Sequence, residues 1–112
     1  MLPTPGNQIT RTDDKAVIMP KGDITASNSA EMRSAMKSLI ADGVRNLVID
    51  LQLVHVIDST GIGLIVAAHN SLERLGGTLA VINSSEELLE LFKVFRLDKH
   101  FSVSASTGLA KG

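Results

Sequence analysis

The sequence predicts one small α/β domain with a mixed, mostly parallel sheet, an N-terminal pair of strands and about three helices. Apolar runs typical of strands alternate along the chain with amphipathic segments of helical length. Strands that are joined by helices require right-handed crossovers, so most of the sheet is expected to be parallel. The chain has 112 residues, 44% of them hydrophobic, which is enough for one core. We expect the domain to span residues 8–105, with a flexible leader at 1–7 and a flexible tail at 106–112.

The composition gives no sign of attraction to charged partners. Eleven Lys and Arg residues stand against twelve Asp and Glu residues without a run of either sign, so direct binding of nucleic acid is not expected. The longest aliphatic run, residues 64–68, is far too short to cross a bilayer, and no membrane insertion is expected. The chain has no cysteine, which fits a reducing compartment, and the cytoplasm is the expected location.

The first two strands are expected at residues 7–12 and 15–21, where apolar and polar residues partly alternate. Asp13 and Asp14 separate the two segments and favour a hairpin. Pro20 cannot donate a backbone hydrogen bond to a neighbouring strand, so this strand lies at an edge, is bulged, or ends there.

Residues 28–43 predict the first helix. Asn28 and Glu31 are spaced as a reciprocal cap at its start, and Gly43 is placed to end it. Apolar residues recur at helical spacing along this segment: Met32, Ala35, Met36, Leu39 and Ile40.

Further strands are expected along the rest of the chain. Residues 45–51 contain consecutive apolar residues, which predicts burial on both faces, and residues 78–83 predict another buried strand. Residues 54–57 extend the sheet or approach its end, and a short last strand is expected over residues 100–105.

The second helix is expected from about residue 60 to residue 75, where Gly76 and Gly77 end it. At about 100° per residue, one side of this helix is apolar and should pack on the sheet. This side carries Leu64, Ile65, Ala68, Leu72 and Leu75. Ser84 and Glu87 form the expected capping box of the third helix.

The junction before the second helix carries an unusual group of polar and small residues. Asp58 or Ser59 can cap the helix, which starts near Thr60. Gly61 and Gly63 are poor helix formers in the first turn, where alanine would be more favourable. Bare backbone lets another chain or a phosphate group approach closely, so the junction is a candidate binding site as well as a cap.

Two aliphatic residues of the second helix fit two interpretations. Ile62 and Val66 fall on the border of the buried side, toward Ser59. They are either the edge of the core or a small apolar docking patch beside the serine.

The junction and its surroundings resemble the STAS domain family, and within it the bacterial anti-sigma factor antagonists. The resemblance is carried by four stretches: IDSTGIG, the following GGTLAVIN, the upstream GDITASNSAEMR and the downstream LFKVFRLDKHF. It covers roughly residues 9–104. It implies a small STAS-type domain that has no catalytic residues, no cofactor and no metal of its own.

The resemblance also implies a phosphorylation switch. Ser59 matches the serine that is phosphorylated in the family, Asp58 the acid before it, and Thr60 a neighbouring hydroxyl that is normally not the target. The implied partner is an anti-sigma factor that is also an ATP-dependent serine kinase. The unphosphorylated antagonist binds this kinase and releases the sigma factor, and a PP2C-type phosphatase resets the switch.

The implied partner-binding surface combines the junction with the turn before the first helix. Its residues are Asp58, Ser59, Thr60, Gly61, Ile62, Gly63, Val66, Asp23 and Thr25. Thr25 stands where the family often has aspartate, so the contact of that acid is expected to be absent or to be made by Asp23.

The sequence also bears on other functions. Some STAS domains serve transporters or lipid-trafficking complexes without a phosphorylation switch, and this is the alternative function. Asp58, Ser59 and a histidine are the residue types of a hydrolytic triad, but the glycine that precedes an elbow serine is missing. Gly61 and Gly63 lack the third small residue of a dinucleotide motif, and no two histidines have metal-ligand spacing. The chain is therefore predicted to be a binding protein and not an enzyme.

Overall fold

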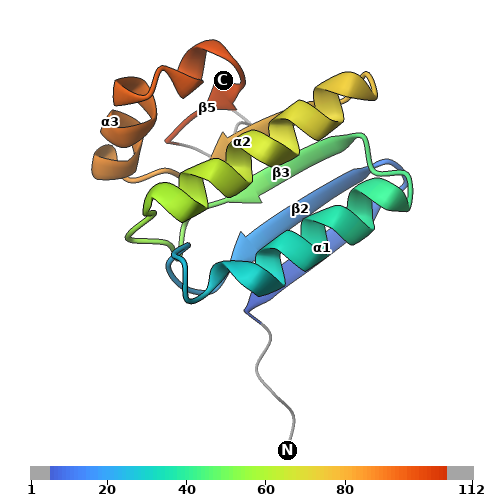
Figure 1. Ribbon diagram of the computed structural model, residues 1–112, viewed down its shortest axis with the longest axis horizontal. Coiled ribbons are helices and arrows are strands. Elements are labelled where there is room, and N and C mark those ends of the chain that lie inside the picture. The colour runs from blue at the N-terminus through green and yellow to red at the C-terminus, as the bar shows by residue number, and fades with distance from the viewer. Residues whose placement is uncertain (1–5, 106–112) are drawn as a thin grey trace, which may run out of the picture.

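The computed structural model describes residues 6–105, and these form a five-stranded sheet with three α-helices (Figure 1). The strands follow one another across the sheet in chain order: β1 (Asn7–Thr12), β2 (Lys15–Pro20), β3 (Asn46–Asp50), β4 (Thr78–Ile82) and β5 (Ser102–Val103). The helices are α1 (Ser29–Ala41), α2 (Ser59–Arg74) and α3 (Glu86–Val94), followed by the 3-10 turn η1 (Leu97–Lys99). β1 is antiparallel to β2 and the other neighbours are parallel, so the predicted fold class is confirmed.

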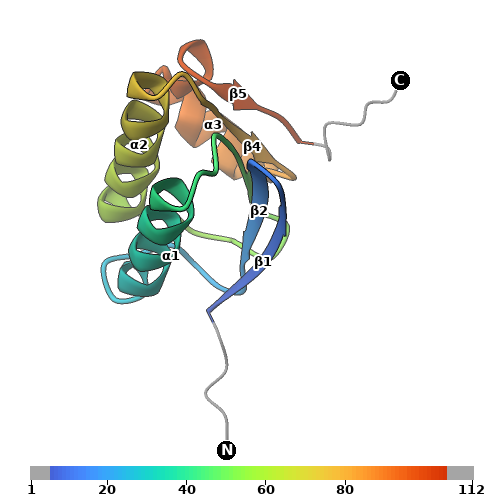
Figure 2. The ribbon, with the colours of Figure 1, turned by 90° about the vertical axis from the view of Figure 1, so that its right-hand side faces the viewer.

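The three helices cover one face of the sheet. The parallel strands lie in chain order, so right-handed crossovers place every connecting helix on the same side. Figures 1 and 2 both show α1 and α2 side by side on this face. Phe101 lies between α2 and α3, because its ring centroid is 5.4 Å from that of His69 and 6.4 Å from that of Phe92. The described helices leave the opposite face of the sheet uncovered.

The core lies between the sheet and the helices. The strands contribute alternate side chains to it: Ala16, Ile18, Leu47, Ile49, Leu79 and Val81. The helices contribute Met32, Met36, Ile65, Leu72, Leu88 and Phe92. The prediction that the third strand is buried on both faces is wrong, because β3 alternates between buried and half-buried residues under helices on one side only.

The start of α1 differs from the predicted cap. Asn28 is the N-cap residue, but its side-chain amide donates to the carbonyl oxygen of Asp23 at 3.1 Å and does not cap the helix. Glu31 accepts instead from the amide of Gly6 at 3.0 Å. The reciprocal cap is therefore wrong, since both side chains bind residues outside the helix. Gly43 follows the helix with φ of +105°, as expected of a residue that ends it.

Two further predicted helix ends are displaced. The cap of α3 is Ser85, whose hydroxyl accepts from the amide of Leu88 at 3.2 Å. Ser84 was the expected cap, but its own amide donates to the carbonyl oxygen of Ser104, so it still belongs to the strand side of the junction. Leu75 was expected to face the sheet, but it follows the last residue of α2 and is 49% exposed.

The hairpin prediction and one of the alternatives for Pro20 are confirmed. Asp13 adopts φ of +54° between β1 and β2, and β2 ends at Pro20. Of the predicted leader, Gly6 and Asn7 are described, and Asn7 begins β1. Its other residues, 1–5, and the whole predicted tail, 106–112, lie outside the described residues. Within residues 6–105, none of the helices has the length and apolar character needed to span a membrane.

Candidate functional site

Two loops meet at the edge of the sheet where the parallel strands end. The β2–α1 loop spans residues 21–28 and the β3–α2 loop spans residues 51–58. Figure 1 shows the two loops next to each other, beside the starts of α1 and α2. In open α/β sheets this edge is where ligand and partner sites gather, so the predicted junction lies where a site is expected.

A short stretch of backbone pairing joins the two loops. Ile24 and Ile57 form a parallel bridge in which the carbonyl oxygen of Val56 accepts from Ile24 at 3.0 Å. The carbonyl oxygen of Ile24 accepts from the amide of Asp58 at 3.2 Å. Both isoleucine side chains are buried. The sheet extension expected over residues 54–57 is thus reduced to one bridge, which makes the two loops a single structural unit.

The Asp58 carboxylate caps α2 and also holds the other loop. One oxygen accepts from the amide of Gly61 at 3.0 Å, and the second accepts from the amide of Ala26 at 3.0 Å. Of the two predicted capping residues, Asp58 is the N-cap and Ser59 is the first residue of the helix. The Gly61 amide, and after it the Ala26 amide, lowers the pKa of Asp58 below its ordinary value, because both hydrogen bonds favour the ionised form.

This lowered pKa predicts a pH-dependent contribution to stability. Because the folded pKa of Asp58 lies below the unfolded value, its stabilising effect is complete above about pH 4 and is lost as the pH falls through the folded pKa. Asp58→Asn should therefore melt below the wild type at neutral pH, and the difference should shrink toward about pH 2. Thermal unfolding followed by circular dichroism across this range measures the effect. Asp98→Asn, at an exposed acid in η1, serves as the control, and a constant offset for Asp58→Asn would contradict the prediction.

Asp23 makes the reverse connection. One of its carboxylate oxygens accepts from the consecutive amides of His55 and Val56, both at 3.0 Å. Each loop therefore contributes an aspartate that binds backbone amides of the other loop. Asp23 was expected to contact a partner in place of the acid that Thr25 lacks, and its observed contacts are within the chain. The Thr25 hydroxyl lies 3.3 Å from the hydroxyl of Ser27.

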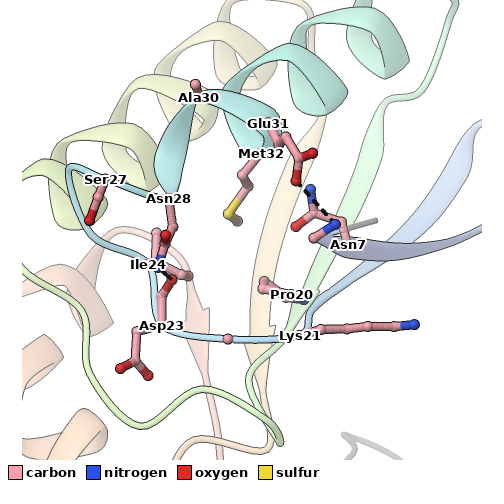
Figure 3. A pocket seen from close by; sticks show the side chains of 12 residues that line it. Asn7, Pro20, Lys21, Asp23, Ile24, Ser27, Asn28, Ala30, Glu31 and Met32 are labelled. Carbon is pink, nitrogen blue, oxygen red and sulfur yellow. Dashed lines mark hydrogen bonds between the residues drawn. The ribbon is translucent and has the colours of Figure 1, made fainter. Parts of the chain in front are cut away.

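A pocket of about 400 Å³ lies on the other side of the β2–α1 loop, between the end of β2 and the start of α1 (Figure 3). Pro20, Ile24 and Met32 line it together with polar residues of the loop. The Asp23 carboxylate is directed away from this pocket in Figure 3, in keeping with its bonds to the β3–α2 loop. The pocket and the junction are thus separated by the loop that carries Asp23.

Ser59 is exposed at the first turn of α2. Its hydroxyl has no hydrogen-bond partner among the described residues. The neighbouring Thr60 is half-buried. The first turn of a helix presents unpaired amides and the positive end of the helix dipole, so an anion attached to Ser59 would be tolerated by the domain.

The two glycines of the junction have different surroundings. A Cβ atom on Gly61 would clash with the carbonyl oxygen of Ile24 and would lie 2.7 Å from a methyl carbon of Ile57. The bare backbone at Gly61 is therefore needed by the chain itself, where its first turn passes over the bridged loops. Gly63 is exposed, and apart from its chain neighbours and the helix backbone around it, no atom of the described residues lies within 4 Å of the place that its Cβ would take. Of these two glycines, Gly63 is the one that leaves backbone open to another molecule.

The apolar residues at this edge are distributed differently from the prediction. Ile62 is 8% exposed and belongs to the core, while Val66 is half-buried against it, so the core-edge interpretation holds for Ile62. Leu53 and Val56 in the β3–α2 loop are 44% and 50% exposed. Sequence reasoning missed them, because an aliphatic residue in a loop has no periodicity that shows which way it points.

The three histidines do not form a site. His69 packs on Phe101 and its ring nitrogen Nε2 lies 3.6 Å from a carboxylate oxygen of Glu73, as expected of a packing residue. His55 and His100 are exposed. Across residues 6–105, His, Asp and Glu side chains make no group of three or more that could hold a metal ion.

The fold and the junction define a class of protein. It is a small α/β domain with an exposed serine at the start of a helix, next to two loops that are joined by hydrogen bonds of aspartate side chains. The chain belongs to the STAS domain family, whose model matches residues 7–110. It is 31% identical over 86 residues to the anti-sigma-B factor antagonist of Bacillus subtilis. The aligned residues cover 77% of this chain and 78% of that protein. Anti-sigma factor antagonists are binding proteins without enzymatic activity, in agreement with the prediction for this chain.

Solved structures share the fold. An anti-sigma factor antagonist from Mycobacterium paratuberculosis matches with a TM-score of 0.80 and 23% identity, over 90% of this chain and 86% of that chain. The anti-sigma factor antagonist SpoIIAA in its unphosphorylated form matches with a TM-score of 0.72 and 20% identity, over 87% and 86% of the two chains. SpoIIAA of Bacillus in its phosphorylated form matches with a TM-score of 0.71 and 19% identity, over 87% and 89%.

Proposed function

We propose that this chain is an anti-sigma factor antagonist whose binding is controlled by phosphorylation of Ser59. The unphosphorylated protein binds an anti-sigma factor that is also a serine kinase, and this binding releases the sigma factor. A PP2C-type phosphatase restores the active form, and the whole cycle takes place in the cytoplasm, where ATP is available. The observation that carries the proposal is the exposed hydroxyl of Ser59 at the start of α2, which has no hydrogen-bond partner within residues 6–105. The existence of SpoIIAA in phosphorylated and unphosphorylated forms supports it by analogy.

The electrostatics of the junction explain how one phosphate could prevent binding of the partner and leave the fold intact. A phosphoserine adds about 1.5 to 2 negative charges and three acceptor oxygens. Within the domain, the helix dipole offsets this charge, and both oxygens of Asp58 are already held by amides. In an interface the same phosphate must lose its water beside the Asp58 carboxylate, which opposes binding. The modified protein should stay folded and lose its partner.

The proposed interface extends along α2 from Ser59. Gly63 lies one helical turn further on, and its open backbone allows a partner chain to come closer than a side chain would. Thr60 and Val66 are half-buried and contribute the edges of this surface, and Thr25 contributes from the neighbouring loop. Gly61, Ile62 and Asp23 support the surface through contacts within the domain.

Incubation with ATP and each candidate anti-sigma factor kinase from the source genome tests the proposal. Mass spectrometry is expected to place a single phosphate on Ser59, and none on Ser59→Ala. Thr60 should remain unmodified in both, because it is half-buried. A phosphate on another residue, or none with any candidate kinase, would instead favour the transporter or lipid-trafficking alternative.

A further inference from the structure

Two exposed aliphatic side chains lie in the β3–α2 loop, which leads into Ser59 at the start of α2. Two aliphatic side chains of this loop are exposed and two are buried: Leu53 and Val56 are 44% and 50% exposed, whereas Val54 and Ile57 are 3% and 6% exposed. The inward pair anchors the loop in the core. The outward pair adds nothing to the core, so the fold does not require aliphatic residues there.

The loop is held in this arrangement by hydrogen bonds on both sides of Val56. The amide of Val56 donates to the Asp23 carboxylate, and its carbonyl oxygen accepts from the amide of Ile24. Further back, the amide of Val54 donates to the carbonyl oxygen of Leu51 at 3.0 Å. A fixed backbone presents its side chains with little further loss of conformational freedom on binding, which favours association.

The two carboxylates that join the loops are already engaged. Asp23 and Asp58 each accept two backbone N–H groups, three of them from the two loops and the fourth from Gly61 in the first turn of α2. Ser59 therefore follows a loop that carries exposed aliphatic side chains and whose neighbouring carboxylates are bound within the domain. Apolar contacts at the centre of an interface, enclosed by polar groups, contribute most of the binding energy in many complexes.

We propose that Leu53 and Val56 are the apolar anchors of the interface and occupy an apolar patch on the kinase that phosphorylates Ser59. Asp23 is the positioning residue that holds these two anchors. The inference rests on the proposed function, because it assigns the contacts of the same partner. Val56 is three residues from Ser59 and is linked to Asp58 through Ile24, so we expect a protein that binds at the serine to contact this loop. A phosphate at Ser59 would then lie at the margin of an apolar contact, where it is most disruptive.

The test is calorimetric titration of the purified kinase with the full chain carrying Leu53→Ser and Val56→Ser. The matched control carries Leu75→Ser and Val94→Ser, at residues that are 49% and 71% exposed at the far ends of α2 and α3. Both doubles should melt close to the wild type, since the altered side chains are exposed. The loop double is expected to bind at least about 30-fold more weakly, and the control within about two-fold of the wild type.

A loop double that binds the kinase within about three-fold of the wild type would overturn the inference and leave the proposed function standing. A wild-type protein that binds none of the candidate kinases would overturn both. The two results are distinguishable because the wild type is titrated first.

Two substitutions of Asp23 test its positioning role separately. Asp23→Ala removes the acceptor for two amides, so hydrogen exchange at His55 and Val56 should become faster and binding weaker. Asp23→Asn keeps a carbonyl acceptor, so it should restore most of the protection from hydrogen exchange and most of the binding affinity. If Asp23→Ala accelerates exchange at these amides but binds the kinase like the wild type, Asp23 does not position the anchors.

Discussion

Ser59→Asp is expected to bind the cognate anti-sigma factor kinase at least about 100-fold more weakly than Ser59→Ala, because like charge in a contact costs several kcal/mol. The aspartate places a permanent charge where the wild type has a neutral hydroxyl, next to the Asp58 carboxylate. Ser59→Ala stays neutral, cannot be phosphorylated and should bind constitutively. Calorimetric titration with the purified kinase, without ATP, measures both affinities directly.

The control for this pair is the same change at a serine away from the junction. Ser38 is exposed on α1, so Ser38→Asp adds the same charge to the domain without adding it to the proposed interface. It should bind like the wild type. All three variants should melt within a few degrees of one another, since neither position is buried. Equal affinities of Ser59→Asp and Ser59→Ala would rule out the switch.

Gly61→Ala is expected to destabilise the domain by roughly 2–3 kcal/mol, at the upper end of the usual cost of overpacking. The added methyl group would clash with the carbonyl oxygen of Ile24, which belongs to the bridge and cannot rotate away as a side chain can. Either α2 must move away from the loops or the bridge must open. Urea unfolding followed by far-ultraviolet circular dichroism is the suitable measurement, since the chain has no Trp or Tyr.

Gly63→Ala is the matched control, made two residues further along the same helix turn. Its new methyl group meets open space, so the isolated domain should gain about 0.5–1 kcal/mol from the better helix propensity of alanine. The same variant should bind the kinase more weakly if a partner backbone approaches Gly63. Equal stabilities of Gly61→Ala and Gly63→Ala would contradict the close packing of α2 on Ile24.

Local signals in the sequence were informative where the decisive contacts are short in range. They predicted the turn at Asp13 and Asp14, and they left a few alternatives for Pro20 and for the cap of α2, among which the structure has the end of β2 and Asp58. Two caps were predicted wrongly, because residues far away in the chain also compete for the side chains and amides at a helix start. Glu31 has the spacing of a capping residue, but it is bound by an amide 25 positions away, which no local pattern reveals.

By itself, the sequence determined the class of the fold, the order of its strands and helices and the position of Ser59 at the start of α2. Each of these follows from periodicity, capping and turn preferences within a few residues. The tertiary structure alone decided that Gly61 is needed inside the domain while Gly63 is open, and that Leu53 and Val56 in the loop before the serine are exposed. It also decided that Asp23 binds amides more than 30 positions away. The reason is physical: burial and hydrogen-bond partners depend on which segments the folded chain brings together. Neither hydrophobicity nor residue spacing shows which segments those are.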